Sequence, residues 1–219
     1  ADADYDVAST TATLTVNKAI PTIGTLGSIS KTFGDANFNL ISPTSNATGV
    51  FSYTSSDSNV VAITGNTVTV VGAGTATITA TQATDANYLA GSITTVITVN
   101  KAVATLSTMA SVTKNFGDAS FSLVTPTSAA TGAVTFSSSD LNVATISGNT
   151  VTIVGAGATT ITATQATDAN YLEATTSFVL TVNKIAPTLG VMTAISKLFG
   201  DSNFTITPPS TNSSGAFTY

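Results

Sequence analysis

The chain has 219 residues and a formal net charge of −5 at pH 7, and only 8% of its residues are charged. Six lysines supply all of the positive charge, so the chain has no basic patch of the kind that neutralises nucleic-acid phosphates. It contains no His and no Cys. An imidazole base, a thiolate nucleophile, a disulfide and the usual zinc ligands are therefore all missing. We expect no nucleic-acid partner, no enzyme activity and no cofactor.

The hydropathy of the chain indicates a folded segment that does not enter a membrane. Hydrophobic residues make up 42% of it, which is enough for a packed core. No apolar run approaches the roughly 18 residues that a membrane-spanning helix needs. The first residues do not resemble a signal peptide. If the protein is secreted, we expect its targeting signals to lie outside this segment.

An 83-residue repeat organises the chain. Phe33-Gly34-Asp35 recurs as Phe116-Gly117-Asp118 and Phe199-Gly200-Asp201, and the run Ile78–Leu89 recurs unchanged as Ile161–Leu172. We predict two complete repeats between two partial ones: residues 1–18, 19–101, 102–184 and 185–219. The unit is longer than common solenoid repeats of about 20–47 residues and suits a small β-sandwich. The partial repeats indicate a window from a longer array.

Within each repeat, apolar residues alternate with Thr, Ser and Asn, which is typical of half-buried antiparallel strands. In chain order, the predicted strand positions are Ala12, Leu14, Val16; Phe38, Leu40; Phe51, Tyr53; Val68, Val70; Ala76, Ile78, Ala80; and Thr95, Ile97, Val99. The second repeat predicts the same strands and ends on Phe178, Leu180 and Val182, and the last partial repeat adds Phe204, Ile206, Phe217 and Tyr219. Helical periodicity is absent. About seven strands per repeat predict an all-β, two-sheet antiparallel sandwich.

Several short motifs occur in the same order in both complete repeats. In the first they are Ser45–Gly49, Tyr53–Asp57, Val61–Ile63, the Gly65-Asn66 turn and Gly72–Ala80. The stretch from Gly34 to Thr81, and again from Gly117 to Thr164, thereby resembles a bacterial immunoglobulin-like (Ig-like) domain of group 2, the intimin/invasin type. The resemblance implies tandem Ig-like sandwich domains arranged head to tail in a large bacterial surface protein. It implies no catalytic residues.

The order of loops in an Ig-like domain predicts where the repeats meet. Phe33-Gly34-Asp35 would lie at the far end of the first repeat, and the loop that holds Asp168 and Asn170 at the near end of the second. Head-to-tail stacking then predicts an inter-repeat junction formed by Asp35, Asp168, Asn170 and the linker Asn100-Lys101.

Two interpretations of this junction stay open. One is a set of polar caps with a solvated Lys–Asp pair, which is typically worth about 0–1 kcal/mol. The other is a calcium ion held by oxygens of Asp35, Asp168 and Asn170. Calcium usually takes about 6–8 oxygens, so backbone carbonyls and water would have to contribute.

The lysines recur at two places in the repeat, Lys18, Lys101 and Lys184, and Lys31, Lys114 and Lys197. Recurrence in every repeat favours a structural role over a single active site. An intramolecular Lys–Asn bond is chemically possible, but the sequence shows no companion acid to catalyse it.

The sequence therefore predicts a stalk, shaft or fibre segment of a large bacterial extracellular, adhesin-like protein at the cell surface. Its partners would be neighbouring repeats and, in a self-assembled filament, copies of itself. The scarcity of surface charge permits such lateral association. The alternatives are an adhesin module that recognises a glycan or receptor, and a phage or virion fibre. The near-identity of the repeats favours the shaft, because binding tips usually carry unique loops and exposed aromatic residues.

Overall fold

The computed structural model describes residues 3–218, and its regular elements there are all β-strands. The chain divides into two compact units. Unit 1 comprises the chain through Thr105 together with Ser128–Gly132 and Ala166–Ala174; unit 2 comprises Leu106–Thr127, Ala133–Gln165 and the chain from Thr175 onward. Unit 1 thus holds the first repeat and three segments of the second, namely residues 102–105 and these two loops. Within the described range, no helix has the length and apolar character needed to cross a bilayer.

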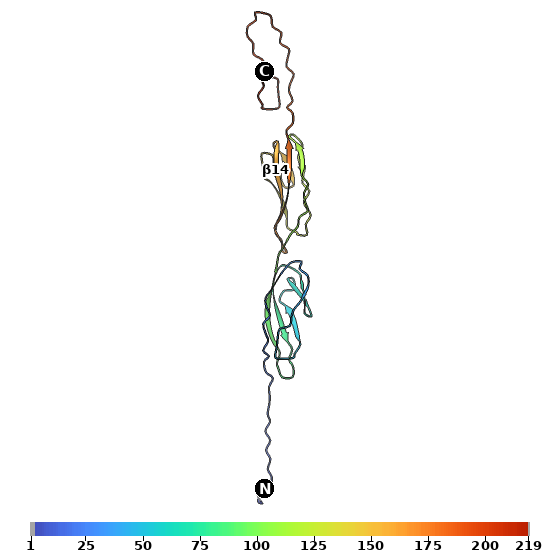
Figure 1. The fold of residues 1–219 in the computed structure, drawn as a ribbon, viewed down its shortest axis with the longest axis vertical. Helices are drawn as coiled ribbons and strands as arrows, with labels where there is room; N and C mark the ends of the chain where they lie inside the picture. Colours follow the sequence, from blue (N-terminus) through green and yellow to red (C-terminus); the bar gives the residue numbers. More distant parts are fainter. Residues whose placement is uncertain (1–2, 219) are drawn as a thin grey trace. The chain divides into compact units, whose positions relative to one another are not determined.

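The first repeat forms a two-sheet sandwich in unit 1 (Figure 1). Its strands are β1 (Ile29–Thr32), β2 (Phe38–Asn39), β3 (Phe51–Ser55), β4 (Val61–Thr64), β5 (Thr67–Val70), β6 (Gly74–Gln82) and β7 (Gly91–Asn100). One sheet has the order β1-β7-β6-β3 and the other β2-β5-β4. The paired strands are antiparallel except β1, which runs parallel to β7 with Ile29 opposite Ile97. The predicted all-β Ig-like sandwich is confirmed, with this one parallel pair added.

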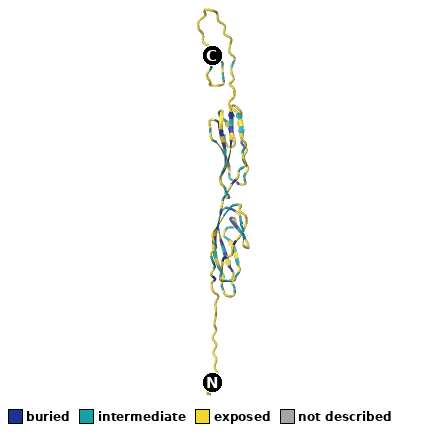
Figure 2. Ribbon diagram, in the orientation of Figure 1, coloured by how far each residue is buried: buried dark blue, intermediate teal, exposed yellow. Residues whose placement is uncertain are grey.

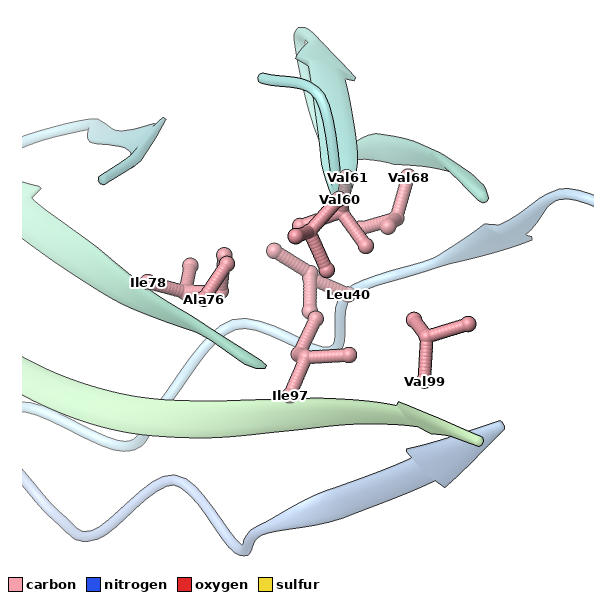
Figure 3. Close-up of a cluster of buried hydrophobic side chains, with 8 residues drawn as sticks. All are labelled: Leu40, Val60, Val61, Val68, Ala76, Ile78, Ile97 and Val99. Atoms are coloured by element: carbon pink, nitrogen blue, oxygen red, sulfur yellow. The ribbon is translucent and has the colours of Figure 1, made fainter. Parts of the chain in front are cut away.

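Alternate residues of these strands fill the core of unit 1 (Figure 2). On β6, Ile78 is fully buried, whereas Thr75 and Thr77 are exposed. Figure 3 shows the buried cluster, whose members are Leu40, Val60, Val61, Val68, Ala76, Ile78, Ile97 and Val99. Burying one such aliphatic side chain contributes about 1.5–3 kcal/mol, which explains why the period-2 pattern selects a strand with one face inward.

The second repeat repeats this arrangement 83 residues later. Its sandwich strands are β9 (Val112–Asn115), β10 (Phe121–Ser122), β11 (Val134–Ser138), β12 (Ala144–Ser147), β13 (Thr150–Ile153), β14 (Gly157–Gln165) and β16 (Ala174–Asn183). The sheets have the orders β11-β14-β16-β9 and β10-β13-β12, and β9 runs parallel to β16. A separate cluster around Ile161, Leu180 and Val151 forms the core of unit 2. Two further short strands, β8 (Ala102–Val103) and β15 (Tyr171–Leu172), pair in parallel within unit 1.

The strands predicted in the two partial repeats do not form. Residues 5–18 contain no strand, and Leu14 and Val16 are exposed. Beyond Asn183, the described residues contain only an isolated bridge between Leu189 and Thr211, so Phe204, Ile206 and Phe217 lie outside any strand. Tyr219 lies outside the described residues.

The pairing scheme explains this difference. In a complete repeat, β1, β2 and β3 pair with β7, β5 and β6, which all come from its second half. The given chain holds no such second half after residue 185, and nothing equivalent to β6 before residue 18. Short-range contacts remain in the last partial repeat: the Nζ of Lys197 lies 5.3 Å from the centre of the Phe204 ring, and Asp201 Oδ2 accepts the N–H of Leu198 at 2.8 Å. Around the Leu189–Thr211 bridge there are also longer-range bonds, such as that from the N–H of Thr188 to Asn212 Oδ1 at 2.9 Å.

Candidate functional site

The predicted junction residues all belong to unit 1, because that unit includes the loop Ala166–Ala174 of the second repeat. We call this loop the near-end loop of the second repeat. It follows β14, contains β15, and carries Asp168 and Asn170. The linker Asn100-Lys101 joins it to the first repeat through β8.

Asp35 and Asn100 both bond within the first repeat, where they hold the corner at Phe33. Asp35 Oδ2 accepts the N–H of Thr32 at 2.9 Å. Gly34 has a φ of 90°, a backbone conformation that favours glycine, and the chain turns a corner there. The carbonyl oxygen of Asn100 accepts the N–H of Phe33 at 2.8 Å, and Asn100 Nδ2 donates to Ser30 Oγ at 3.1 Å. The corner that carries Phe33 is therefore fixed from both sides.

Asp168 organises the near-end loop. Its Oδ1 accepts the N–H groups of Asn170 at 2.9 Å and Tyr171 at 2.8 Å. Its Oδ2 accepts the N–H of Thr131 at 2.6 Å and the hydroxyl of the same residue at 2.9 Å. These bonds, the Thr131 N–H foremost, lower the pKa of Asp168 from 3.8 to about 2. The carboxylate is a structural acceptor that is ionised at neutral pH.

Lys101 contacts Asp168 through the main chain. Its Nζ donates to the backbone carbonyl of Asp168 and, at 3.2 Å, to Thr167 Oγ1. The N–H of Ala102 donates to the carbonyl of Asn170 at 2.9 Å. Lys101 thus contacts the carbonyl of Asp168, while the carboxylate of Asp168 accepts hydrogen bonds from Thr131, Asn170 and Tyr171.

Two further contacts join the near-end loop to the first repeat inside unit 1. Asn170 Oδ1 accepts the N–H of Ala73, in the turn Gly72-Ala73-Gly74, at 2.9 Å. The rings of Phe33 and Tyr171 lie 5.4 Å apart between centroids at an interplanar angle of 82°, which is an edge-to-face arrangement. Such pairs contribute about 0.5–1.5 kcal/mol beyond the area they bury.

The calcium interpretation has no convergent set of carboxylates behind it. The structure brings Asn170 to the first repeat, but Asp35 and Asp168 each accept hydrogen bonds inside their own repeat. Among residues 3–218, no group of three or more His, Cys, Asp or Glu could hold a metal ion.

Sequence reasoning placed Asn170 at the junction but missed its partners. Ala73 takes part through a backbone N–H, which residue type does not reveal. Tyr171 could have been found, because it lies in the run Ile161–Leu172 that repeats Ile78–Leu89 without change.

Comparisons with known proteins add nothing on function. No protein-family profile matches the chain, and no curated protein matches it either. Among solved structures, it is similar to Drosophila N-cadherin EC1-4, with 10% identity over 76% of this chain and 50% of that chain and a TM-score of 0.37. It is also similar to titin domains z1z2 in complex with telethonin, with 18% identity, coverage of 78% and 100%, and a TM-score of 0.35.

A third similar structure is that of domains 4 and 5 of the S-layer protein SbsC, with 26% identity, coverage of 62% and 70%, and a TM-score of 0.25. The present chain spans half the length of the N-cadherin chain. Because these TM-scores are low, the fold assignment depends on the strand order and pairing described above.

Proposed function

We propose that this chain is a segment of the shaft of a large extracellular protein of the bacterial surface, built from tandem Ig-like domains of the group 2, intimin/invasin type. Its work is to hold another part of the protein at a distance. The observation that carries this proposal is the attachment of the near-end loop to the first repeat through Asn170 and Tyr171. The partners of each repeat are then its neighbours in the same chain.

The chemistry of the polar side chains supports a structural role over catalysis. With no His and no Cys, a nucleophile would need a Lys or a carboxylate as its base. The Nζ of Lys101 is bonded to the near-end loop, and the Nζ of Lys31 lies 4.7 Å from the centre of the Phe38 ring. Asp85 and Asp168 each accept four hydrogen bonds, and both have a pKa lowered to about 2. Neither of these two carboxylates is poised to exchange a proton near pH 7.

The two complete repeats are also too alike for one of them to stand out as a specific binding surface. They share the loop Thr-Asp-Ala-Asn-Tyr, and both use it in the same hydrogen-bonding pattern. The linker Val99–Ala102 is short and lacks Gly and Ser. A repeated module on short linkers suits a spacer whose stability is a sum of repeat and neighbour terms.

Single-molecule force extension of the chain, combined with a glycan-array screen, tests this function. We expect two separate unfolding events, each releasing a contour length of roughly 270–300 Å for an 83-residue unit at about 3.3–3.6 Å per residue. We expect no glycan to be bound above background. Extension without discrete events, or saturable binding of one glycan class, would overturn the shaft proposal.

A further inference from the structure

We propose that the surface formed by Phe33 and Gly72-Ala73-Gly74, the far-end socket, recognises the Asn-Tyr pair of the following repeat. In this way the near-end loop of the second repeat completes the fold of the first. The inference deepens the shaft proposal and rests on it, because it names the partner of each repeat and the residues that select it. The division into units supports it, since the loop Ala166–Ala174 is grouped with the first repeat.

The backbone N–H of Ala73, in the first repeat, finds its hydrogen-bond acceptor in the following repeat. The carbonyl of Val60 already takes the N–H groups of Val71 and Gly72, at 2.9 and 3.2 Å. The next N–H in the turn, that of Ala73, donates to Asn170 Oδ1 of the following repeat at 2.9 Å. A half-buried N–H without a partner would be unfavourable, so the carboxamide of Asn170 serves as the cap of this turn.

The second repeat provides an internal comparison for the socket. Gly72 is buried and Ala73 half-buried, whereas their equivalents Gly155 and Ala156 are half-buried and exposed. Phe33 is half-buried beside Tyr171, whereas Phe116 is 46% exposed. The socket that contacts a near-end loop is therefore covered more completely at each of these positions.

The near-end loop has the same internal hydrogen bonds whether or not it contacts a far-end socket. In the first repeat, Asp85 makes the same four contacts as Asp168, with Thr48, Asn87 and Tyr88. Lys18 donates to Thr84 Oγ1 and the Asp85 carbonyl as Lys101 does to Thr167 and Asp168. Asn87 is exposed, whereas Asn170 is half-buried. Because the loop is preorganised, little conformational freedom is lost when its Asn and Tyr dock.

Each repeat carries both surfaces, one at each end, so successive repeats join in one direction only. The far end of a repeat carries Phe and Gly-Ala-Gly, and the near end carries Asn and Tyr. In the second repeat, the equivalent of the far-end socket consists of Phe116 and Gly155-Ala156-Gly157. By the same rule it would receive the Asn-Tyr loop of a further repeat of the same kind.

Amide hydrogen exchange of the full chain tests the inference, with Ala156 and Asn87 as matched controls. We expect the N–H of Ala73 to exchange about tenfold more slowly than that of Ala156, as one net hydrogen bond implies. Asn170→Ala should remove this difference. Asn87→Ala, which changes the same loop position in the first repeat, should leave it intact. Asn170→Asp keeps an acceptor at the same place and should preserve the slow exchange of Ala73, which separates capping from a general loss of structure.

Equal exchange of Ala73 and Ala156 in the unaltered chain, or slow exchange of Ala73 that survives Asn170→Ala, would overturn the inference. Either result would leave two force-unfolding events possible, so the shaft proposal would stand. Conversely, specific glycan binding would contradict the shaft without changing the exchange of Ala73. The two proposals therefore fail on different measurements.

Discussion

Asn100 and Lys101 are consecutive residues whose side chains bind to different repeats. Asn100 Nδ2 donates to Ser30 Oγ of the first repeat at 3.1 Å, and Lys101 Nζ donates to Thr167 Oγ1 of the second at 3.2 Å. Both contacts lie inside unit 1. The side chains on either side of a single peptide bond are therefore both held by hydrogen bonds, which lowers their conformational freedom.

Replacing Lys101 should weaken the contact between the linker and the near-end loop. Lys101→Met removes the hydrogen bonds to Thr167 and to the Asp168 carbonyl while keeping an apolar stem of similar length. We expect a loss of about 1 kcal/mol in the free energy of unfolding. Urea titration of the full chain measures it, and Lys101→Arg, which can still donate to both acceptors, should lose much less. Equal losses in the two variants would show that the Nζ contacts contribute nothing.

The two cores should respond separately to truncation. Ile78 and Ile161 are fully buried in different clusters. Ile78→Ala should lower the unfolding free energy of the first repeat by about 2–5 kcal/mol, through lost burial and the cavity left behind. Amide exchange resolved by residue should show the change in β6 and spare β14. The exposed neighbour change Thr77→Ala should have an effect within about 0.5 kcal/mol.

Acid should weaken both near-end loops. Hydrogen bonds from Thr48 N–H, Asn87 N–H and other loop donors lower the pKa of Asp85 from 3.8 to about 2 in the folded chain. A group with a lowered pKa stabilises the fold fully above its unfolded value, and this stabilisation declines as the pH falls from about 4 to about 2.

Urea midpoints measured between pH 5 and pH 1.5 should therefore fall across that window. Asp85→Asn, which has no charge to lose, should flatten the decline. A carboxyl titration near pH 4 for Asp85, followed by NMR, would contradict the assigned role of these bonds.

Gly49 should not tolerate a side chain, because its backbone passes close to that of Ala83. A Cβ built on Gly49 would lie 1.8 Å from the Ala83 carbonyl oxygen. Gly49→Ala must therefore push two backbone segments apart, and we expect it to destabilise the first repeat by about 1–3 kcal/mol. Gly27→Ala is the control, since a Cβ there meets nothing within 4 Å. Thermal unfolding compares the two variants, and equal melting temperatures would contradict the steric argument.

Much of the sandwich was predictable, because period-2 alternation depends on residue type alone. The alternation of Ala76, Ile78 and Ala80 with Thr predicts one buried face, and these three residues are buried in β6. The parallel pairing of β1 with β7 was not predictable in this way, since strand direction depends on which sheet the first strand joins. The strand at Ala12–Val16 was expected from the same alternation, but a strand also needs a partner.

The junction was predictable in its residues more than in its bonds. The recurring loops pointed to Asn170 as an inter-repeat contact, and it does bond to the first repeat. Asp35 and Asp168 were expected beside it as partners, yet both carboxylates accept backbone N–H groups close to them in their own loops. Short-range capping of this kind competes with longer contacts, and residue type does not show which will form.

The shaft is tested most directly by asking whether the two repeats reorient in solution as one body. Residual dipolar couplings from the amides of β6 and β14, measured on the weakly aligned full chain, report one alignment tensor for each rigid body. If the near-end loop locks the repeats together, the tensors fitted separately to the two sets of couplings should agree in magnitude and rhombicity. Two tensors of clearly different magnitude would mean that the repeats move independently, and would contradict a shaft built from coupled repeats.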